Sequence, residues 1–238
     1  MFLFGKLKNH FYTWLELQAE KCEFVSRKIE ITLVEHNPRD KIIDLGCGDG
    51  SFTLQVAQKV GITNIVGLDI DERNVAQALS SRIIVSIGDL NQSLPFQESY
   101  FDGVIASHVI EHLNDTDNFL KEIFRILKSG GYLILATPNL ASWHNIILLS
   151  LGKQPTVAEV SDHVLVGTWS PRQKSLGRVG PAHRRIFTVG AINELLEHYG
   201  FKIEKCIGTG IFPFLTNSIL TRINKNHATN IVIKAFKP

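Results

Sequence analysis

The chain has 238 residues, of which 44% are hydrophobic and 20% are charged. This composition excludes a disordered, collagen-like or disulfide-framework protein, and the length suits one domain with insertions. Twenty-five basic and 23 acidic side chains give a formal net charge of +2, so no strong basic field points to nucleic acid. No apolar stretch approaches the about 18 residues of a membrane-spanning helix. The three cysteines (Cys22, Cys47 and Cys206) lie far apart and fit reduced thiols, so we expect a cytoplasmic protein.

Five short apolar runs, rich in β-branched residues, predict buried parallel strands. They cover residues 42–45, 65–69, 83–87, 104–107 and 132–136. Helical patterns lie between them, one with Ser51 as N-cap and Gly61 as its end, and another from Asp115 to Gly130. Alternating strands and helices imply an α/β protein with a parallel sheet covered on both faces.

The alternation stops after Pro138. Residues 139–186 contain one possible helix, from Leu140 to Leu151, and then a run rich in Gly, Pro, Ser and His. So long a stretch with so little pattern is typical of an active-site lid. A helical pattern returns after Thr188, the predicted N-cap, and ends at Gly200.

The two ends of the chain complete the predicted fold. Two strand candidates, residues 201–207 and 230–236, are joined by a loop, which favours an antiparallel, hairpin-like ending. The first 35 residues predict a helix with an apolar stripe, formed by Phe4, Leu7, Phe11, Trp14 and Leu15. We favour packing of this stripe over the active site, and contact with a membrane surface is the alternative.

The most informative segment runs from Asp44 to Ser51 and joins the first predicted strand to a helix. Its glycines allow the tight turn and the close approach of a ligand that such a junction needs. Their spacing is G-x-G-x-G, whereas the dinucleotide fingerprint G-x-G-x-x-G would need a glycine in place of Ser51. The carboxylate of Asp44 would repel a pyrophosphate but attract an ammonium or a sulfonium. The loop therefore favours a cationic nucleoside over NAD.

Two further acids follow the next two strands. Asp69 ends the second strand, roughly 20 residues beyond the loop, where a carboxylate accepts hydrogen bonds from ribose hydroxyls. Asp89 follows the third strand and suits the exocyclic amine of a base, for which Ile70 and Leu90 are apolar plates. The competing interpretation, that Asp44, Asp69 and Asp89 only cap turns and helices, leaves the glycine spacing unexplained.

Six motifs carry a resemblance to a known family: DLGCGDG at 44–50, VGLDID at 66–71, GDL at 88–90, FDGVIASHVIEHL at 101–113, LKSGGYLILATPN at 127–139 and HRRIFT at 183–188. Together they resemble the class I S-adenosylmethionine-dependent methyltransferases, of the small-molecule type that includes the ubiquinone-biosynthesis O-methyltransferases. The resemblance implies a Rossmann-like α/β fold with a seven-stranded, mostly parallel sheet, helices on both faces and an antiparallel last strand. It also implies S-adenosylmethionine as cofactor and S-adenosylhomocysteine as product.

The resemblance divides the chain and assigns cofactor contacts. We expect a helical extension over residues 1–37, a cofactor-binding core over 38–138 and 187–238, and a substrate-side insert over 139–186. The cofactor contacts it implies are Gly46, Cys47 and Gly48 at the methionine end, Asp69 at the ribose, Asp89 at the adenine amine, and Ser107 or His108 beneath the cofactor.

A cluster of His108, Glu111 and His112 follows the fourth strand, and its side chains share one face if the segment turns helically. Such a set can bind a metal, and the string matches the H-x-x-E-H motif of zinc peptidases, which belongs on a long helix. Some ubiquinone-type enzymes hold a divalent ion here, but His108 stands where an acid is expected. We therefore favour no metal and treat the histidines as candidate general bases; alternatively Glu111 and His112 only orient the loop.

The acceptor is expected beside the insert, on the same side as Glu111. His183 is a third candidate base, and Arg185 suits a carboxylate or phosphate; a turn cap and a structural ion pair are the alternatives. Trp143 and the run 140–151 are expected to wall an apolar pocket, or else to pack the lid onto the sheet. We predict methyl transfer to a small molecule, with oxygen favoured by resemblance. The competing functions are an NAD-linked oxidoreductase and a non-catalytic binding module.

Overall fold

The computed structural model describes residues 21–63, 65–80, 83–155, 157–164, 166–167, 181–211 and 224–238. The apolar stripe predicted between Phe4 and Leu15 lies outside these residues. A helix over residues 21–33 forms the described part of the predicted N-terminal helix. None of the described helices is long and apolar enough to cross a membrane.

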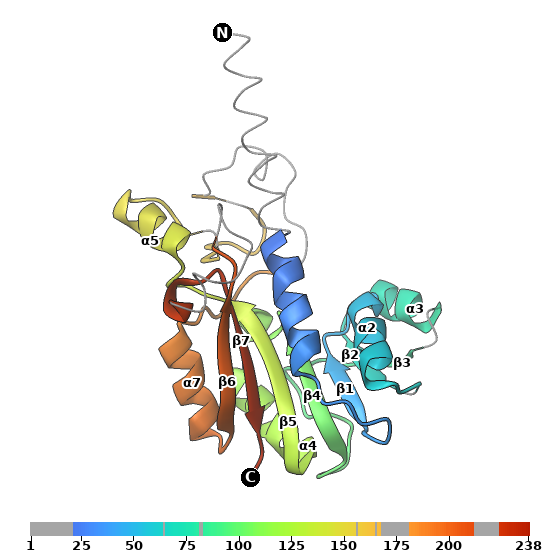
Figure 1. Cartoon of the computed structure of the whole chain (residues 1–238). Coiled ribbons are helices and arrows are strands. Elements are labelled where there is room, and N and C mark those ends of the chain that lie inside the picture. Colours follow the sequence, from blue (N-terminus) through green and yellow to red (C-terminus); the bar gives the residue numbers. More distant parts are fainter. Residues whose placement is uncertain are drawn as a thin grey trace.

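A seven-stranded sheet forms the centre of the molecule, in the order β3-β2-β1-β4-β5-β7-β6 (Figure 1). Its strands are β1 (Ile42–Leu45), β2 (Val66–Asp69), β3 (Ile84–Ile87), β4 (Phe101–Ser107), β5 (Leu127–Pro138), β6 (Lys202–Thr209) and β7 (Asn230–Phe236). Five neighbouring strands, β3, β2, β1, β4 and β5, run parallel to one another. Strand β7 is antiparallel to both β5 and β6. The predicted Rossmann-like sheet with one antiparallel strand is therefore confirmed.

Helices cover both faces of the sheet (Figure 1). The helices are α2 (Ser51–Val60), α3 (Glu72–Ser80), α4 (Thr116–Ile126), α5 (Trp143–Ser150) and α7 (Val189–His198), with 3-10 turns η1 (Ile110–His112) and η2 (Lys225–His227). Of these, α5 covers neither face and lies beyond the end of the sheet (Figure 1). The end of the helix over residues 21–33 packs with α2 on one face, and α4 and α7 pack on the other. Parallel strands need such crossovers, and the crossovers bury the apolar side chains of both faces.

In several cases the capping residues of the helices are those that the sequence predicts. The side chain of Asp115 accepts a hydrogen bond from the Asn118 amide at the start of α4. Thr188 does the same for the Ala191 amide at the start of α7. Gly61, in the left-handed conformation, ends α2 as predicted.

Two predicted helix ends are wrong. The N-cap of α2 is Gly50 rather than Ser51, because the glycine loop turns into the helix through a left-handed residue that only glycine adopts easily. Helix α4 ends at Ile126, well before Gly130, because Leu127 already pairs with β4 as the first residue of β5. The pairing of β5 with β4, rather than Gly130, therefore ends this helix.

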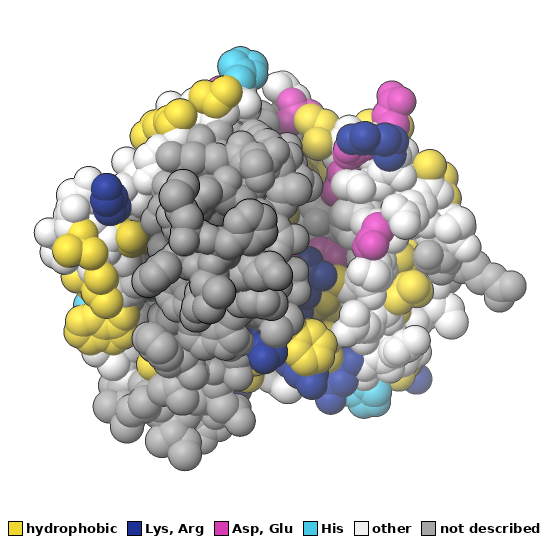
Figure 2. Space-filling model, turned by 90° about the horizontal axis from the view of Figure 1, so that it is seen from above, with side chains coloured by type: hydrophobic (Ala, Val, Ile, Leu, Met, Phe, Trp, Pro, Cys, Tyr) yellow, Lys and Arg dark blue, Asp and Glu magenta, His cyan; other side chains and the backbone are white. Residues whose placement is uncertain are grey.

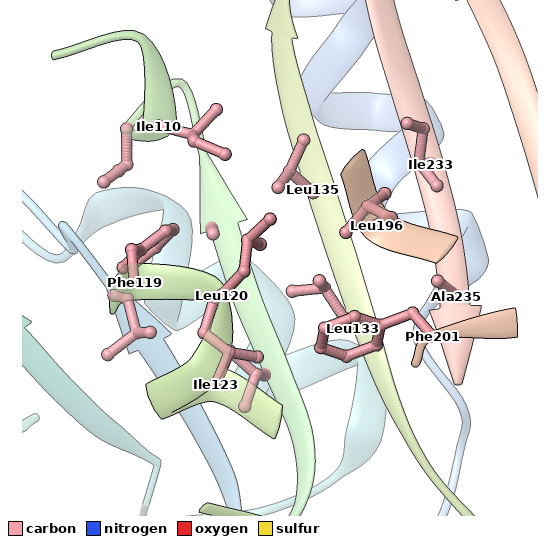
Figure 3. Packing of buried hydrophobic residues seen from close by; sticks show 14 of the residues in the cluster. Ile110, Phe119, Leu120, Ile123, Leu133, Leu135, Leu196, Phe201, Ile233 and Ala235 are labelled. Carbon is pink, nitrogen blue, oxygen red and sulfur yellow. The ribbon is translucent and has the colours of Figure 1, made fainter. Parts of the chain in front are cut away.

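Aliphatic and aromatic side chains fill the space between the sheet and helices α4 and α7 (Figure 3). Phe119, Leu120 and Ile123 of α4 point toward the sheet and are fully buried. Leu133 of β5 and Leu196 of α7 meet them there, also without exposed surface. Burial of each such side chain contributes about 1.5–3 kcal/mol, so the strands that carry the candidate site are held rigidly.

Candidate active site

The glycine loop lies between β1 and α2, at the carboxyl end of β1. Gly46, Gly48 and Gly50 have φ angles of 76°, 56° and 78°, which other residues rarely adopt. A side chain at Gly46 would clash with Val109, and one at Gly50 would clash with Ile83. At Gly48, in contrast, no described atom lies within 4 Å of the place where a side chain would start. The loop is therefore packed tightly at both ends and open in its middle, where a ligand can approach.

Asp69, at the end of β2, binds the loop from the neighbouring strand. Its Oδ2 atom accepts a hydrogen bond from the Gly48 amide at 2.9 Å. Its Oδ1 atom accepts one from the Asp71 amide at 2.9 Å and one from Asn74 Nδ2 at 3.3 Å. One carboxylate, 8% exposed, thus joins the glycine loop to the start of α3.

A cavity of about 80 Å³ adjoins the loop, lined by Asp44, Gly46, Cys47, Gly48, Asp49, Ser51, Phe52, Ser107 and Arg27. Arg27 belongs to the helix over residues 21–33 and was missed by our reading of the sequence. Its guanidinium lies 5.7 Å from the centre of the Phe52 ring and 2.9 Å from Glu23. The only sequence signal was the four-residue spacing from Glu23, which is common on exposed helices.

A second cavity, of about 370 Å³, lies away from the glycine loop, around Lys41 and Tyr100. The Lys41 ammonium lies 3.9 Å from the centre of the Tyr100 ring. Among the described residues that line this cavity, none belongs to the predicted site. This cavity is the larger of the two, but the residues of the motifs line the smaller one, so we take the smaller cavity as the candidate site.

Asp44 is the most deeply buried acid of the loop, with 2% of its surface exposed. Its Oδ2 atom accepts a hydrogen bond from Thr53 Oγ1 at 2.6 Å. Burial raises the pKa of Asp44 from 3.8 to about 7, although the Thr53 bond acts in the opposite direction. Burial also raises the pKa of the Cys47 thiol, to about 12, so this cysteine is not a nucleophile.

The third acid lies at the end of β3. Asp89 accepts hydrogen bonds from the amide and the side chain of Asn91, each at 2.9 Å, and these bonds lower its pKa. Of the two predicted apolar plates, Ile70 is 65% exposed and Leu90 only 6%. Leu90 packs into the core beneath α4, so Ile70 is the plate that is free to meet a ligand.

His108 follows β4 directly and adopts a left-handed backbone conformation, with φ of 55°. Such a conformation stores strain in a bulky residue and is held here by its surroundings. Its Nδ1 atom lies 3.3 Å from Oε1 of Glu111, which is 2% exposed and also accepts a hydrogen bond from Thr137. Burial lowers the pKa of His108 and raises that of Glu111, but their mutual attraction outweighs burial and reverses both shifts. The two side chains therefore form a buried ion pair.

His112 and His183 stand side by side, with ring centres 4.9 Å apart. Nδ1 of His112 lies 3.1 Å from the carbonyl oxygen of Ala182, and Nδ1 of His183 lies 3.0 Å from that of Val157. A carbonyl only accepts hydrogen bonds, so each Nδ1 carries the proton and each Nε2 keeps its lone pair when the ring is neutral. Burial lowers the pKa of His112, which favours that neutral form.

A different set of residues converges than the predicted metal set of His108, Glu111 and His112. Ligand atoms of Glu111, His112 and His183 lie within 4.8 Å of one another. Two imidazoles that donate Nδ1–H to carbonyls, beside one carboxylate, fit a divalent ion as well as they fit proton transfer. His108 instead pairs with Glu111 and neutralises that carboxylate.

The insert is attached to this cluster where it re-enters the core. The amides of Arg184 and Arg185 donate hydrogen bonds to the carbonyl oxygen of Glu111, at 2.6 and 3.1 Å. The guanidinium of Arg185 is exposed and donates to the carbonyl oxygen of Asn114 at 3.1 Å. Trp143, at the start of α5, lies with its ring 4.5 Å from that of His227 and is 44% exposed. The acceptor-binding roles of Arg185 and Trp143 stay predictions.

The surface above the carboxyl ends of the strands carries different types of side chain on its two sides. Figure 2 shows acidic side chains on the side of α2 and α3, and apolar side chains on the opposite side, where α5 lies. The apolar side chains of α5 include Ile147 and Leu149, which are 54% and 55% exposed. The charged part of the candidate site therefore lies next to α2 and α3.

Comparison with known proteins agrees with this geometry. A family model described as a methyltransferase domain matches residues 14–205, and the chain belongs to that family. The chain is 30% identical, over 70% of its length, to a probable S-adenosylmethionine-dependent methyltransferase from Mycolicibacterium smegmatis. It is 31% identical, over 50% of its length, to the mitochondrial ubiquinone biosynthesis O-methyltransferase of Rattus norvegicus. The chain spans 54% and 38% of the lengths of these two relatives.

Solved structures support the fold. A crystal structure of an S-adenosylmethionine-dependent methyltransferase from Thermotoga maritima, described as a possible histamine N-methyltransferase, has a TM-score of 0.63. It is 20% identical in sequence, and the match covers 99% of this chain and 98% of that one. At this identity the likeness concerns the fold alone.

Asp44→Asn should stabilise the ligand-free protein at pH 8 and much less at pH 5. The pKa of Asp44 is raised on folding, so its favourable contribution is complete below pH 3.8 and is lost as the pH rises to about 7. Above that pH the buried charge costs on the order of a few kcal/mol, which the asparagine removes. Thermal unfolding of both proteins at both pH values measures this. An equal shift at pH 5 and pH 8 would contradict the assigned ionisation.

Proposed function

We propose that the chain is an S-adenosylmethionine-dependent methyltransferase that acts on a small molecule and methylates an oxygen atom. The observation that carries the proposal is the convergence of the glycine loop with Asp44, Asp69 and Asp89 at the ends of three adjacent strands. The family membership and the names of the relatives support it.

The residues at the strand ends fit the cofactor. The Gly48 amide and the Asp69 carboxylate offer polar atoms beside an open space, and Asp89 and Ile70 offer a hydrogen-bond acceptor and an exposed apolar surface. Asp44 adds a carboxylate that a cationic ligand favours and a pyrophosphate does not. The NAD-linked alternative is therefore disfavoured by charge as well as by the loop spacing.

Methyl transfer from a sulfonium needs no covalent enzyme intermediate. When bound, the cofactor supplies a methyl group whose bond to sulfur breaks as the acceptor oxygen bonds to it, with the electron pair left on sulfur. The protein then has to align the acceptor and remove its proton. Alignment of this kind contributes up to about 7–11 kcal/mol in favourable cases.

His112 is the base that the geometry supports best among the three predicted histidines. His108 is held protonated by Glu111, and a protonated imidazole cannot accept a proton. His112 has a lowered pKa, and its Nε2 atom has no hydrogen-bond partner among the described residues, with His183 beside it. We assign proton removal to His112 and the placement of its ring to Ala182, whose carbonyl fixes the tautomer.

Asp69→Ala should weaken the binding of S-adenosylhomocysteine by more than about 1 kcal/mol, because a charged hydrogen-bond acceptor is lost. Calorimetry would compare S-adenosylhomocysteine with NAD on the wild-type protein and on the variant. Asp162→Ala, on the exposed surface of the insert, is the matched control. Unchanged affinity in folded Asp69→Ala, or preferred binding of NAD by the wild type, would refute the proposal.

His112→Ala should reduce methyl transfer to hydroxyl acceptors by about 10²–10⁴-fold while leaving cofactor affinity unchanged. Isotope-labelled S-adenosylmethionine and mass spectrometry would follow transfer to a panel of phenols, catechols and amines, with and without a chelator. The exposed His198→Ala variant is the control. Full activity in His112→Ala would remove this base, and loss of activity on chelation would favour a metal at Glu111, His112 and His183. Binding without transfer to any acceptor would favour the non-catalytic module.

A further inference from the structure

Strand β3 is one of the two outermost strands of the sheet (Figure 1). It pairs with β2 on one side, and on its outer side no other strand lies against it among the described residues. In such a strand, alternate backbone amides and carbonyls point outward and can pair with another strand. The outer side of β3 is therefore a place where a further strand can add to the sheet.

The other outermost strand, β6, is protected against such pairing. It contains Lys202, Glu204 and Lys205, and its register with β7 shifts after Ile203. Charged side chains and irregularities of this kind keep the edge of a sheet from pairing with another chain. Strand β3, with the sequence Ile-Val-Ser-Ile, has no charged residue, no proline and a regular register with β2. The sequence of β3 therefore leaves its outer side open to pairing.

Apolar side chains beside this outer side are exposed. Ile84 and Ile87 of β3 are 54% and 56% exposed, and Leu79, near the end of α3, is 55% exposed. Ile83, directly before the strand, is in contrast buried and lies close to Ala78 of α3. Exposed apolar side chains that gather beside an unpaired strand indicate a surface that another protein chain covers.

The pattern of side chains favours a second copy of the same chain. Along one face of the strand the side chains are Ile83, Val85 and Ile87, a series that reads the same in both directions. An antiparallel copy centred on Val85 places this residue opposite itself and Ile87 opposite Ile83. Because β3 carries no charge, self-pairing brings no like charges together, and β-branched side chains pair well across strands.

We propose that the outer side of β3, together with the end of α3, is the interface of a two-fold symmetric dimer, in which the two β3 strands pair antiparallel and join the two sheets. The inference goes beyond the proposed function and does not depend on it. Two-fold dimers are the commonest oligomers of soluble proteins, and both subunits use the same surface in them. Strand pairing supplies main-chain hydrogen bonds, and the alternating side chains supply specificity.

Helix α3 has to contribute to this interface, because a strand of four residues is short. The helix packs against β3, and its last turn lies beside the start of the strand, where Ala78 is close to Ile83. In the two-fold arrangement, Ile87 of one copy comes to Ile83 of the other, and so to the neighbourhood of Leu79 in that other copy. The exposed side chains of Ile87 and Leu79 are then buried against each other.

Sedimentation velocity over a range of protein concentrations tests this interface on wild type, Ile87→Lys and Ile147→Lys. Ile147, on α5, is 54% exposed, so the control makes the same substitution at nearly equal exposure on another surface. We expect wild type and Ile147→Lys to sediment as dimers. In Ile87→Lys the dissociation constant of the dimer should rise by about tenfold or more, because a charged group enters an apolar contact.

Cysteine cross-linking tests the register. The Val85→Cys variant places two thiols opposite each other at the two-fold axis. Opposite residues of an antiparallel pair have Cα atoms about 4.5–5.5 Å apart, a separation that a disulfide can span. We expect mild oxidation to give a covalent dimer of Val85→Cys, and none of the wild type or of Ile147→Cys.

A wild type that stays monomeric at every concentration would overturn the inference, as would a dimer that Ile87→Lys leaves unchanged. If Ile147→Lys dissociates the dimer instead, α5 forms the interface and the assignment to β3 fails. A dimeric Val85→Cys that does not cross-link would refute antiparallel pairing centred on Val85. If Ile87→Lys does not fold, Ser86→Lys, at an exposed position of the same strand, takes its place with the same expected result.

Discussion

The hydrogen bond from the Gly48 amide to Asp69 is the contact on which the candidate site depends. It joins the end of β1 to the end of β2, and the amides of Gly46 and Cys47 strengthen the link by donating to the carbonyl oxygen of Leu68. Because β1 and β2 pair in parallel, the carboxyl ends of both strands lie at the same edge of the sheet. The loop is therefore placed by the sheet, and its left-handed glycines let it follow that placement.

The site also concentrates charge that the fold does not neutralise. Asp44 is buried without an ion pair among the described residues, whereas Glu111 is neutralised by His108. Buried unpaired carboxylates lower stability, and a well-packed core compensates for them. Such a conflict between local stability and local chemistry is typical of a functional site, where a ligand supplies the missing interaction.

The acceptor side is built from segments far apart in the chain. Glu111 and His112 follow β4, and His183 lies some 70 residues later, where the insert returns to the core. The carbonyl oxygen of Glu111 accepts both amides that follow His183, so backbone bonds bring the two histidines together. Any movement of the insert would therefore change the positions of these two imidazole rings relative to each other.

The sequence by itself determined the strand order along the chain, the glycine loop and the acids at the strand ends, because these depend on local pattern and spacing. It missed the end of α4, which strand pairing decided, and it did not place His183 beside Glu111 and His112, because that contact depends on how the insert returns to the core. Only the tertiary structure brought Arg27 to the loop. Helical periodicity reports which residues are buried, but the neighbours of a buried charge depend on how the helix crosses the sheet.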